Sequence, residues 1–200
     1  MQKSAPQMST PALLVSAHIF SSAVREVFGA AVLSEVAGEK LSATQLKLLY
    51  FAAKADRHTI GDAAGFLRVS NAAASKAVDK LVRLKLLRRT REQQDRRACH
   101  ISATEAGRRL IAAYETARHK MASRVFGRFS AHELRKTAQL LDRLAAAIVR
   151  HGTRPAGICL QCEVCYRASC RFAALSRRTC VYKFNKSKKQ GALEPGSNEL

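Results

Sequence analysis

The chain has 200 residues, of which 47% are hydrophobic and 25% are charged, as expected for a folded domain of ordinary size. No apolar run approaches the roughly 20 residues of a membrane-spanning helix, which excludes a transmembrane protein and predicts no membrane partner. Lysine and arginine number 35 against 15 acidic residues, and the formal net charge of +20 indicates a polyanionic partner, most often nucleic acid.

The N-terminal segment does not have the pattern of a secretory signal. Residues 1–24 contain one lysine, and their weakly apolar stretch is interrupted by serine and histidine. We therefore expect a cytoplasmic protein. Because disulfides are rarely maintained in a reducing compartment, metal binding or redox chemistry is a better expectation for the six cysteines than a disulfide framework.

The first predicted element is a long helix. Residues 1–10 are polar, and we expect them to be flexible. From Pro11 to about Gly38, apolar residues recur every three or four positions, which is the period of one helix face. The residues in this stripe are Leu13, Ala17, Phe20, Val24, Val27 and Ala31.

Four further helix starts are marked by one device, a Ser or Thr followed three residues later by an acid or glutamine. This pattern is the capping box, in which the two side chains bond to each other's backbone amides. The pairs are Ser42 with Gln45, Thr59 with Asp62, Ser102 with Glu105, and Ser130 with Glu133. With them, the periodicity predicts helices at about 43–55, 60–67, 71–84, 103–127 and 131–150.

A two-stranded hairpin is predicted between the helices 71–84 and 103–127. Its strands are Leu86 to Arg91 and Ala98 to Ile101, and a polar turn, residues 92–95, joins them.

The helices 60–67 and 71–84 form a predicted helix-turn-helix, joined through Val69, with Ser70 as the cap of the second helix. The apolar residues spaced to pack the pair are Leu67, Val69, Ala74, Val78, Leu81 and Val82. The N-terminal half of the second helix should enter the major groove of DNA. The candidate DNA-contacting residues are Ser70, Asn71, Ala72, Ser75 and Lys76, with Lys80 and Arg83 nearer the phosphate backbone.

The hairpin adds an electrostatic contribution to DNA binding. From Lys80 to Arg97 there are eight basic residues and two acidic ones. A wing of this kind inserts arginine into the minor groove, for which Arg96 or Arg97 is best placed. Asp95 is predicted to orient one of these arginines by a hydrogen bond.

Residues 12–150 resemble the MarR family of bacterial transcription regulators. The most specific part of this similarity is DRRACHISATEAGRRL, residues 95–110, which is similar to the wing signature of that family. The resemblance implies a winged-helix homodimer in which the N-terminal helix and the last two helices of each chain interleave. It also implies that the two winged helices bind double-stranded DNA at a pseudo-palindromic operator.

The sequence departs from the family's usual pattern at Lys85, where the family has glycine at the end of the recognition helix. If the backbone there is left-handed, a residue other than glycine costs about 1 kcal/mol.

Two apolar stripes in the C-terminal helices support the homodimer. They are Ala106, Leu110, Ala113, Ala117, Met121 and Val125, and then Leu134, Ala138, Leu141, Ala145 and Ile148. Both stripes could instead belong to the core of one chain, as helix stripes usually do. Helices of this length, however, leave more apolar face than one winged helix covers, so we expect an obligate dimer.

The predicted fold class is mainly α with a small β-wing, a winged helix-turn-helix with long dimerisation helices. Residues 1–10 form a flexible N-terminus, and 11–151 form the DNA-binding and dimerisation domain. After His151, a Gly- and Pro-containing break begins a Cys-rich segment, 152–181, and then a basic tail, 182–200, which we expect to be disordered.

The Cys-rich segment is a candidate metal site. Its five cysteines are Cys159, Cys162, Cys165, Cys170 and Cys180. The first three have the C-x2-C-x2-C spacing that resembles ferredoxin-type [4Fe–4S] ligation, although the next gap is four residues and Arg171 stands in place of proline. Zinc is the alternative metal, and a third alternative is no metal, with free or reversibly oxidised cysteines.

The sequence thus predicts a sequence-specific transcription regulator, a repressor acting as a homodimer, that responds to redox state or iron through its cysteines. One alternative is a basic architectural DNA-binding protein. Another is a regulator that responds to a small-molecule effector and uses zinc as a structural clasp. No nucleophile–base pair, phosphate loop or paired-acid motif stands out, so we expect no enzymatic activity.

Overall fold

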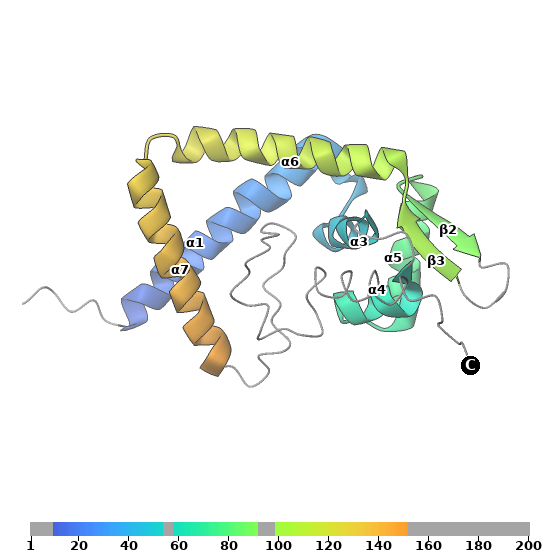
Figure 1. Cartoon of the computed structure of the whole chain (residues 1–200), viewed down its shortest axis with the longest axis horizontal. Helices are drawn as coiled ribbons and strands as arrows, with labels where there is room; N and C mark the ends of the chain where they lie inside the picture. The colour runs from blue at the N-terminus through green and yellow to red at the C-terminus, as the bar shows by residue number, and fades with distance from the viewer. Residues whose placement is uncertain (1–9, 54–57, 92–98, 152–200) are drawn as a thin grey trace, which may run out of the picture.

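A computed structural model of the chain describes residues 10–53, 58–91 and 99–151 (Figure 1). The predictions for the flexible N-terminus and for the segments 152–181 and 182–200 fall on residues outside this part, apart from Thr10.

The N-terminal helical region follows the prediction in its extent. It consists of α1 (Thr10–Arg25), η1 (Glu26–Ala31) and α2 (Val32–Ala37), and a 3₁₀ turn, η2 (Gly38–Lys40), ends it. Gly38 has a φ of +59°, which glycine adopts without steric cost. The segment η1 is a π-helix, which the sequence did not predict; such segments are frequent at functional sites.

Five helices and three strands follow. They are α3 (Ala43–Ala53), β1 (His58–Thr59), α4 (Ile60–Leu67), α5 (Asn71–Arg83), β2 (Leu87–Arg91), β3 (Cys99–Ala103), α6 (Glu105–Phe126) and α7 (Ala131–His151). Figure 1 shows α3, α4, α5 and the hairpin gathered at one end of α6, and α7 at its other end.

The capping boxes predicted for α3, α4 and α7 are confirmed. In the second, the amide of Thr59 donates to the Asp62 carboxylate at 2.8 Å, and the Asp62 amide donates to Thr59 Oγ1 at 3.0 Å. In the third, Ser130 donates to Glu133 through its amide at 2.8 Å and its hydroxyl at 2.7 Å, and these bonds lower the pKa of the Glu133 carboxyl.

The remaining predicted cap, Ser102 with Glu105, is wrong, and α6 begins at Glu105, two residues after the predicted start at about residue 103. Ser102 lies buried in β3, where its hydroxyl accepts a hydrogen bond from Arg88 Nε at 2.9 Å. The cap of α6 is Thr104, whose Oγ1 accepts from the Gly107 amide at 3.1 Å. Strand β3 continues to Ala103, because its pairing with β2 overrides the local capping pattern.

The sheet of the described residues is antiparallel, with strand order β1-β3-β2. Ile101 of β3 is the central partner, paired with His58 on one side and Arg89 on the other. The hairpin prediction is confirmed. The sequence did not predict β1, because two residues are too few to show a period of two.

The core lies between α3, α5 and the sheet. Its largest fully buried side chains include Phe51, Leu48, Leu49, Leu81, Leu87 and Ile101. Ala74, Val78 and Leu81 are buried as predicted for the helix-turn-helix. Val69 was predicted to pack there and is instead 38% exposed; it follows Arg68, which has a left-handed φ of 58°.

The apolar stripe of α6 divides between two environments. Leu110, Ala117 and Met121 pack against the core of the same chain, so this part of the stripe belongs to the monomer. Val125, beyond the core, is 38% exposed.

Helices α1 and α7 keep large apolar side chains exposed. In α1, Leu14 and Ile19 are 61% and 62% exposed, and in α7, Leu141 and Ile148 are 38% and 63% exposed. Among the described residues, no helix is both long and apolar enough to cross a membrane.

Candidate nucleic-acid interface and adjoining cavity

Helix α5 has one buried face and one face open to solvent. Ser70 caps it by accepting a hydrogen bond from the Ala73 amide at 3.2 Å. Burial of Ala74 and Val78 against the core turns the opposite side outward. The structure places the predicted DNA-contacting residues of this region as follows: Ser70, Asn71, Ala72, Lys76 and Arg83 are exposed, and Ser75 and Lys80 are half-buried.

A side chain from the wing reaches the open part of this helix. Arg89, in β2, forms an ion pair with Asp79 at 2.8 Å (Nη1 to Oδ1), and its Nη2 donates to Ser75 Oγ at 3.4 Å. Asp79 follows Ser75 by one helical turn, so both lie on the same side of α5. This link fixes the hairpin against the recognition helix and brings a guanidinium to the predicted interface.

Sequence reasoning did not identify Arg89 or Asp79 as site residues. Arg89 is one of several arginines in the basic strip, and Asp79 is a lone acid on a helix. Their pairing requires knowing that β2 packs beside α5, which no local pattern shows.

The base of the hairpin is fixed by Thr104. Its hydroxyl donates to the carbonyl of Lys85 at 2.7 Å, and Lys85 has a left-handed φ of 58°. The sequence identified Lys85 as the position where the family's glycine is missing, and the left-handed backbone confirms why glycine would suit it.

The predicted residues at the wing tip, Asp95, Arg96 and Arg97, lie outside the described residues. Their role in the minor groove remains a prediction. The same holds for the cysteines from Cys159 to Cys180. Within the described ranges, no group of three or more His, Cys, Asp or Glu side chains is arranged to hold a metal ion.

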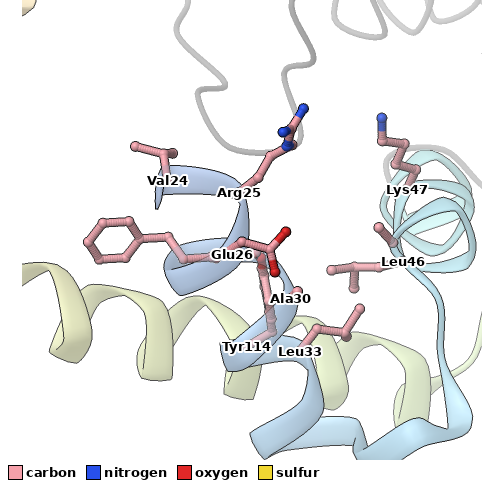
Figure 2. A pocket seen from close by; sticks show the side chains of 11 residues that line it. Val24, Arg25, Glu26, Ala30, Leu33, Leu46, Lys47 and Tyr114 are labelled. Atoms are coloured by element: carbon pink, nitrogen blue, oxygen red, sulfur yellow. Dashed lines mark hydrogen bonds between the residues drawn. The ribbon is translucent and has the colours of Figure 1, made fainter. Parts of the chain in front are cut away.

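A cavity of about 330 Å³ lies where η1, α3 and α6 meet. Its floor is apolar and includes Ala30, Leu33, Leu46 and Tyr114. Figure 2 shows Arg25 and Lys47 on opposite walls with their charged ends toward the same side, and Glu26 below Arg25 on the same wall. The cavity thus combines an apolar interior with charged groups at its edge, as is usual for small-molecule sites.

Two tyrosines stabilise the surroundings of the cavity. Tyr114 is 4% exposed, and its hydroxyl donates a hydrogen bond to the carbonyl of Phe28 in the π-helical segment at 2.9 Å. Tyr50 donates to Glu115 Oε1 at 3.2 Å, and its ring centroid lies 6.5 Å from that of Tyr114. Burial, with the nearby Glu115 carboxylate, raises the pKa of Tyr50, so this hydroxyl stays protonated and remains a donor.

The model of the MarR family matches residues 39–98, which span α3, α4, α5 and β2. A comparison with curated proteins finds no match.

Solved structures agree over a larger part of the chain. The YusO protein of Bacillus subtilis is 21% identical, with a TM-score of 0.58 over 70% of this chain and 99% of that one. A MarR family protein from Bacillus stearothermophilus is 20% identical, with a TM-score of 0.58 over 72% of this chain and 99% of that one. FabT of Streptococcus pneumoniae, solved in complex with DNA, is 19% identical, with a TM-score of 0.53 over 68% of this chain and 93% of that one.

The helix-turn-helix, the hairpin fixed against it and the long helix α6 define a winged-helix fold. The family model matches residues 39–98, and the solved structures share the fold at 19–21% identity, so this part of the chain is similar to the MarR family.

Proposed function

We propose that this protein is a sequence-specific DNA-binding repressor that acts as a homodimer on a pseudo-palindromic operator. The observation that carries the proposal is the open face of α5, where Asn71 and Lys76 are exposed and Arg89 is held beside them by Asp79. Asparagine, lysine and arginine supply the hydrogen-bond donors that recognise base edges and phosphates in the major groove. The net charge of +20 favours the encounter with DNA.

The exposed apolar residues of α1 and α7 support the homodimer. Phe20 and Leu140 are 44% and 51% exposed, in addition to the leucines and isoleucines of α1 and α7 described above. Large apolar side chains exposed in this number on two helices mark a protein interface. A second copy of the chain would cover it and would place two winged helices on one duplex.

Selection of duplexes from a random library by the full-length protein tests sequence-specific binding. We expect an enriched palindromic site whose binding survives excess random duplex at rising salt. The double variant Asn71→Ala, Lys76→Ala should lose at least about tenfold in affinity for that site. Lys120→Ala, an exposed cation on α6, is the control and should bind as the wild type does. If no sequence is enriched, the alternative of a basic architectural protein is favoured.

The cavity supports control by a small-molecule effector. Because η1, α3 and α6 all line it, a ligand bound there would alter how the winged helix is held relative to the dimerisation helices, and by linkage would alter operator affinity. Its apolar floor and an edge with two cations, Arg25 and Lys47, against one acid, Glu26, fit a compact apolar molecule with one anionic group. Benzoate and benzylamine, compared by thermal shift, test this preference. Stabilisation by benzoate that Arg25→Gln weakens is expected, and equal effects of the two compounds would contradict it.

The cysteines Cys159, Cys162, Cys165, Cys170 and Cys180 are proposed to hold a [4Fe–4S] cluster, on the basis of their spacing. A bound cluster would supply redox or iron responsiveness. Zinc as a structural clasp is the alternative.

Visible absorption with iron, sulfide and zinc analysis of anaerobically purified protein separates these outcomes. A variant with Cys159, Cys162 and Cys165 changed to serine is the control. Stoichiometric iron and sulfide that are absent from the variant support the cluster, and zinc alone supports the clasp. If neither metal is present, reversible thiol oxidation or an effector in the cavity would supply the signal.

A further inference from the structure

Helix α7 has a basic face opposite its apolar one. Leu134, Leu141 and Ile148 mark the apolar face and are 37%, 38% and 63% exposed. On the other side lie exposed basic residues, of which positions 132, 136, 143 and 150 are four or seven apart and so are aligned on one face, with residue 135 beside them. These residues are His132, Arg135, Lys136, Arg143 and Arg150, which we call the α7 basic face.

The α7 basic face carries one lysine and three arginines, and acids lie only at its borders. The two acids of the helix lie at its borders: Glu133 is engaged by Ser130 at the start of the helix, and Asp142 precedes Arg143. A helix face that serves only solvation usually alternates acids and bases. Clustering of one sign on one face instead produces a field that attracts a polyanion.

The α7 basic face is remote from the recognition helix. Figure 1 shows α7 at the end of α6 opposite the hairpin and α5. Helix α6 has 22 residues, which at 1.5 Å per residue is about 33 Å. A duplex bound to α5 and the wing is therefore separated from α7 by about the length of α6.

We infer that the α7 basic face is a second DNA-binding surface, which contacts the phosphates of another duplex segment without sequence preference. This inference rests on the proposed function, in which the winged helices hold the operator. The protein would then bridge two stretches of DNA, one read by α5 and one held by α7. Lysine and arginine at helical spacing, without a groove-entering element, suit phosphate contacts and not base contacts.

DNA is favoured over an anionic membrane as the occupant of the α7 basic face. A basic amphipathic helix binds a membrane by burying its apolar face among the lipids. In the proposed homodimer a second copy covers that apolar face. The α7 basic face, on the other side of the helix, stays open to a rigid polyanion.

A two-duplex recruitment assay with the full-length protein tests the inference. The selected operator duplex is immobilised and saturated with protein, and a fluorescent random duplex of the same length is then added over a range of NaCl concentrations. The test variant is Arg135→Gln, Lys136→Gln and Arg143→Gln together. The control is Arg109→Gln, Lys120→Gln and Arg124→Gln together, an equal loss of charge from exposed positions of α6.

The α7 variant should bind the operator as the wild type does but recruit the second duplex about tenfold less at low salt. The slope of log affinity against log salt concentration should fall by about three, one for each lost phosphate contact. The α6 control should recruit normally. Bridging through the two winged helices of a dimer would not respond to substitutions in α7, so the variant separates the two routes.

Normal recruitment by the α7 variant would overturn the inference, and so would an equal loss in the α6 control, which would indicate a total-charge effect. Binding to phosphatidylglycerol vesicles that depends on α7, without recruitment of the duplex, would assign the face to a membrane instead. If the wild type fails to bind the immobilised operator, the proposed function fails. Fluorescence anisotropy of the random duplex with both triple variants then still decides whether α7 binds DNA.

Discussion

Lys85 is a non-glycine residue with a left-handed backbone, at a φ of 58°. It lies between the end of α5 and the start of β2, where its carbonyl accepts the hydrogen bond of Thr104 at 2.7 Å. The β-carbon of an L-residue crowds the adjacent carbonyl in this conformation, and the fold keeps the strain because the turn connects the recognition helix to the wing.

Lys85→Gly should therefore stabilise the protein. Glycine relieves the strain but enlarges the freedom of the unfolded chain, so we expect a net gain of about 0.5–1 kcal/mol in the free energy of unfolding. Urea denaturation at one fixed protein concentration measures it. Lys85→Ala retains the β-carbon and should give no gain; if it stabilises as much as glycine, the side chain and not the backbone is responsible.

The ion pair of Arg89 and Asp79 should contribute more to the specificity of DNA binding than to the stability of the fold. Their side chains are 33% and 43% exposed, and an exposed pair of this kind contributes about 0–1 kcal/mol. The carboxylate, however, fixes the direction of the guanidinium beside α5. Without it, Arg89 would be free to contact any phosphate, which raises binding to random DNA relative to the operator.

Asp79→Asn should lower the ratio of operator affinity to random-duplex affinity by about tenfold, the size of one well-placed contact, with little change in unfolding free energy. Competition binding of both duplexes measures the ratio. Glu105→Gln is the matched control, because it removes an exposed acid that pairs with Arg109 at 3.6 Å on α6. An unchanged ratio in Asp79→Asn would mean that the pair has only a structural role.

At the scale of elements, the junction between the wing and α6 depends on a close approach at Gly107. A β-carbon added there would meet the backbone carbonyl of Leu86 and the side chain of Leu49. Thr104 holds the same junction from the other side, because its hydroxyl donates to the Lys85 carbonyl and its amide donates to the Leu86 carbonyl. The carbonyls of Lys85 and Leu86 are unable to move without disturbing the hairpin.

Gly107→Ala should destabilise the protein by about 1–3 kcal/mol, the usual range for overpacking in a fixed environment. Thermal unfolding of the variant measures the loss. Gly65→Ala is the matched control: Gly65 is exposed in α4 with nothing near its added β-carbon, so alanine should stabilise there by about 0.5–1 kcal/mol. Equal effects of the two substitutions would contradict the proposed clash.

The elements that the sequence predicted well are those with local signals. Thr59 and Ser130 cap helices through residues three positions away, and the burial of Val78 and Leu81 follows from helical spacing. The elements it missed depend on partners distant in sequence. Ser102 resembles a cap but accepts a hydrogen bond from Arg88 in β2. In the π-helical segment, the Phe28 carbonyl accepts a hydrogen bond from Tyr114, which is distant in sequence.

The candidate DNA interface was predictable on α5, because the helix-turn-helix has its own pattern of buried residues. The contribution of Arg89 was not predictable, because it depends on how β2 packs beside Asp79 of α5. The cavity was not predictable residue by residue either: Arg25 and Lys47 come from helices that meet only in the folded chain.

At the scale of the whole molecule, the distribution of apolar surface separates two parts. Around α3, α5 and the sheet, large side chains such as Phe51 and Leu48 are fully buried. In α1 and α7, residues such as Ile19 and Ile148 are 62% and 63% exposed. A chain that completes its core at one end and leaves it open at the other is suited to association through the open end.

Leu141→Glu with Ile148→Glu should convert the proposed dimer into a monomer, because two charges would be buried in an apolar interface. Sedimentation velocity should show a mass near 21.9 kDa for the variant and twice that for the wild type. Operator affinity should fall by about 10²–10⁴-fold, since the two winged helices no longer bind as one linked unit. Gln139→Glu adds an acid to the opposite face of α7 and should remain dimeric. Loss of the dimer in that control as well would assign assembly to charge, and a variant that stays dimeric would place the interface away from α7.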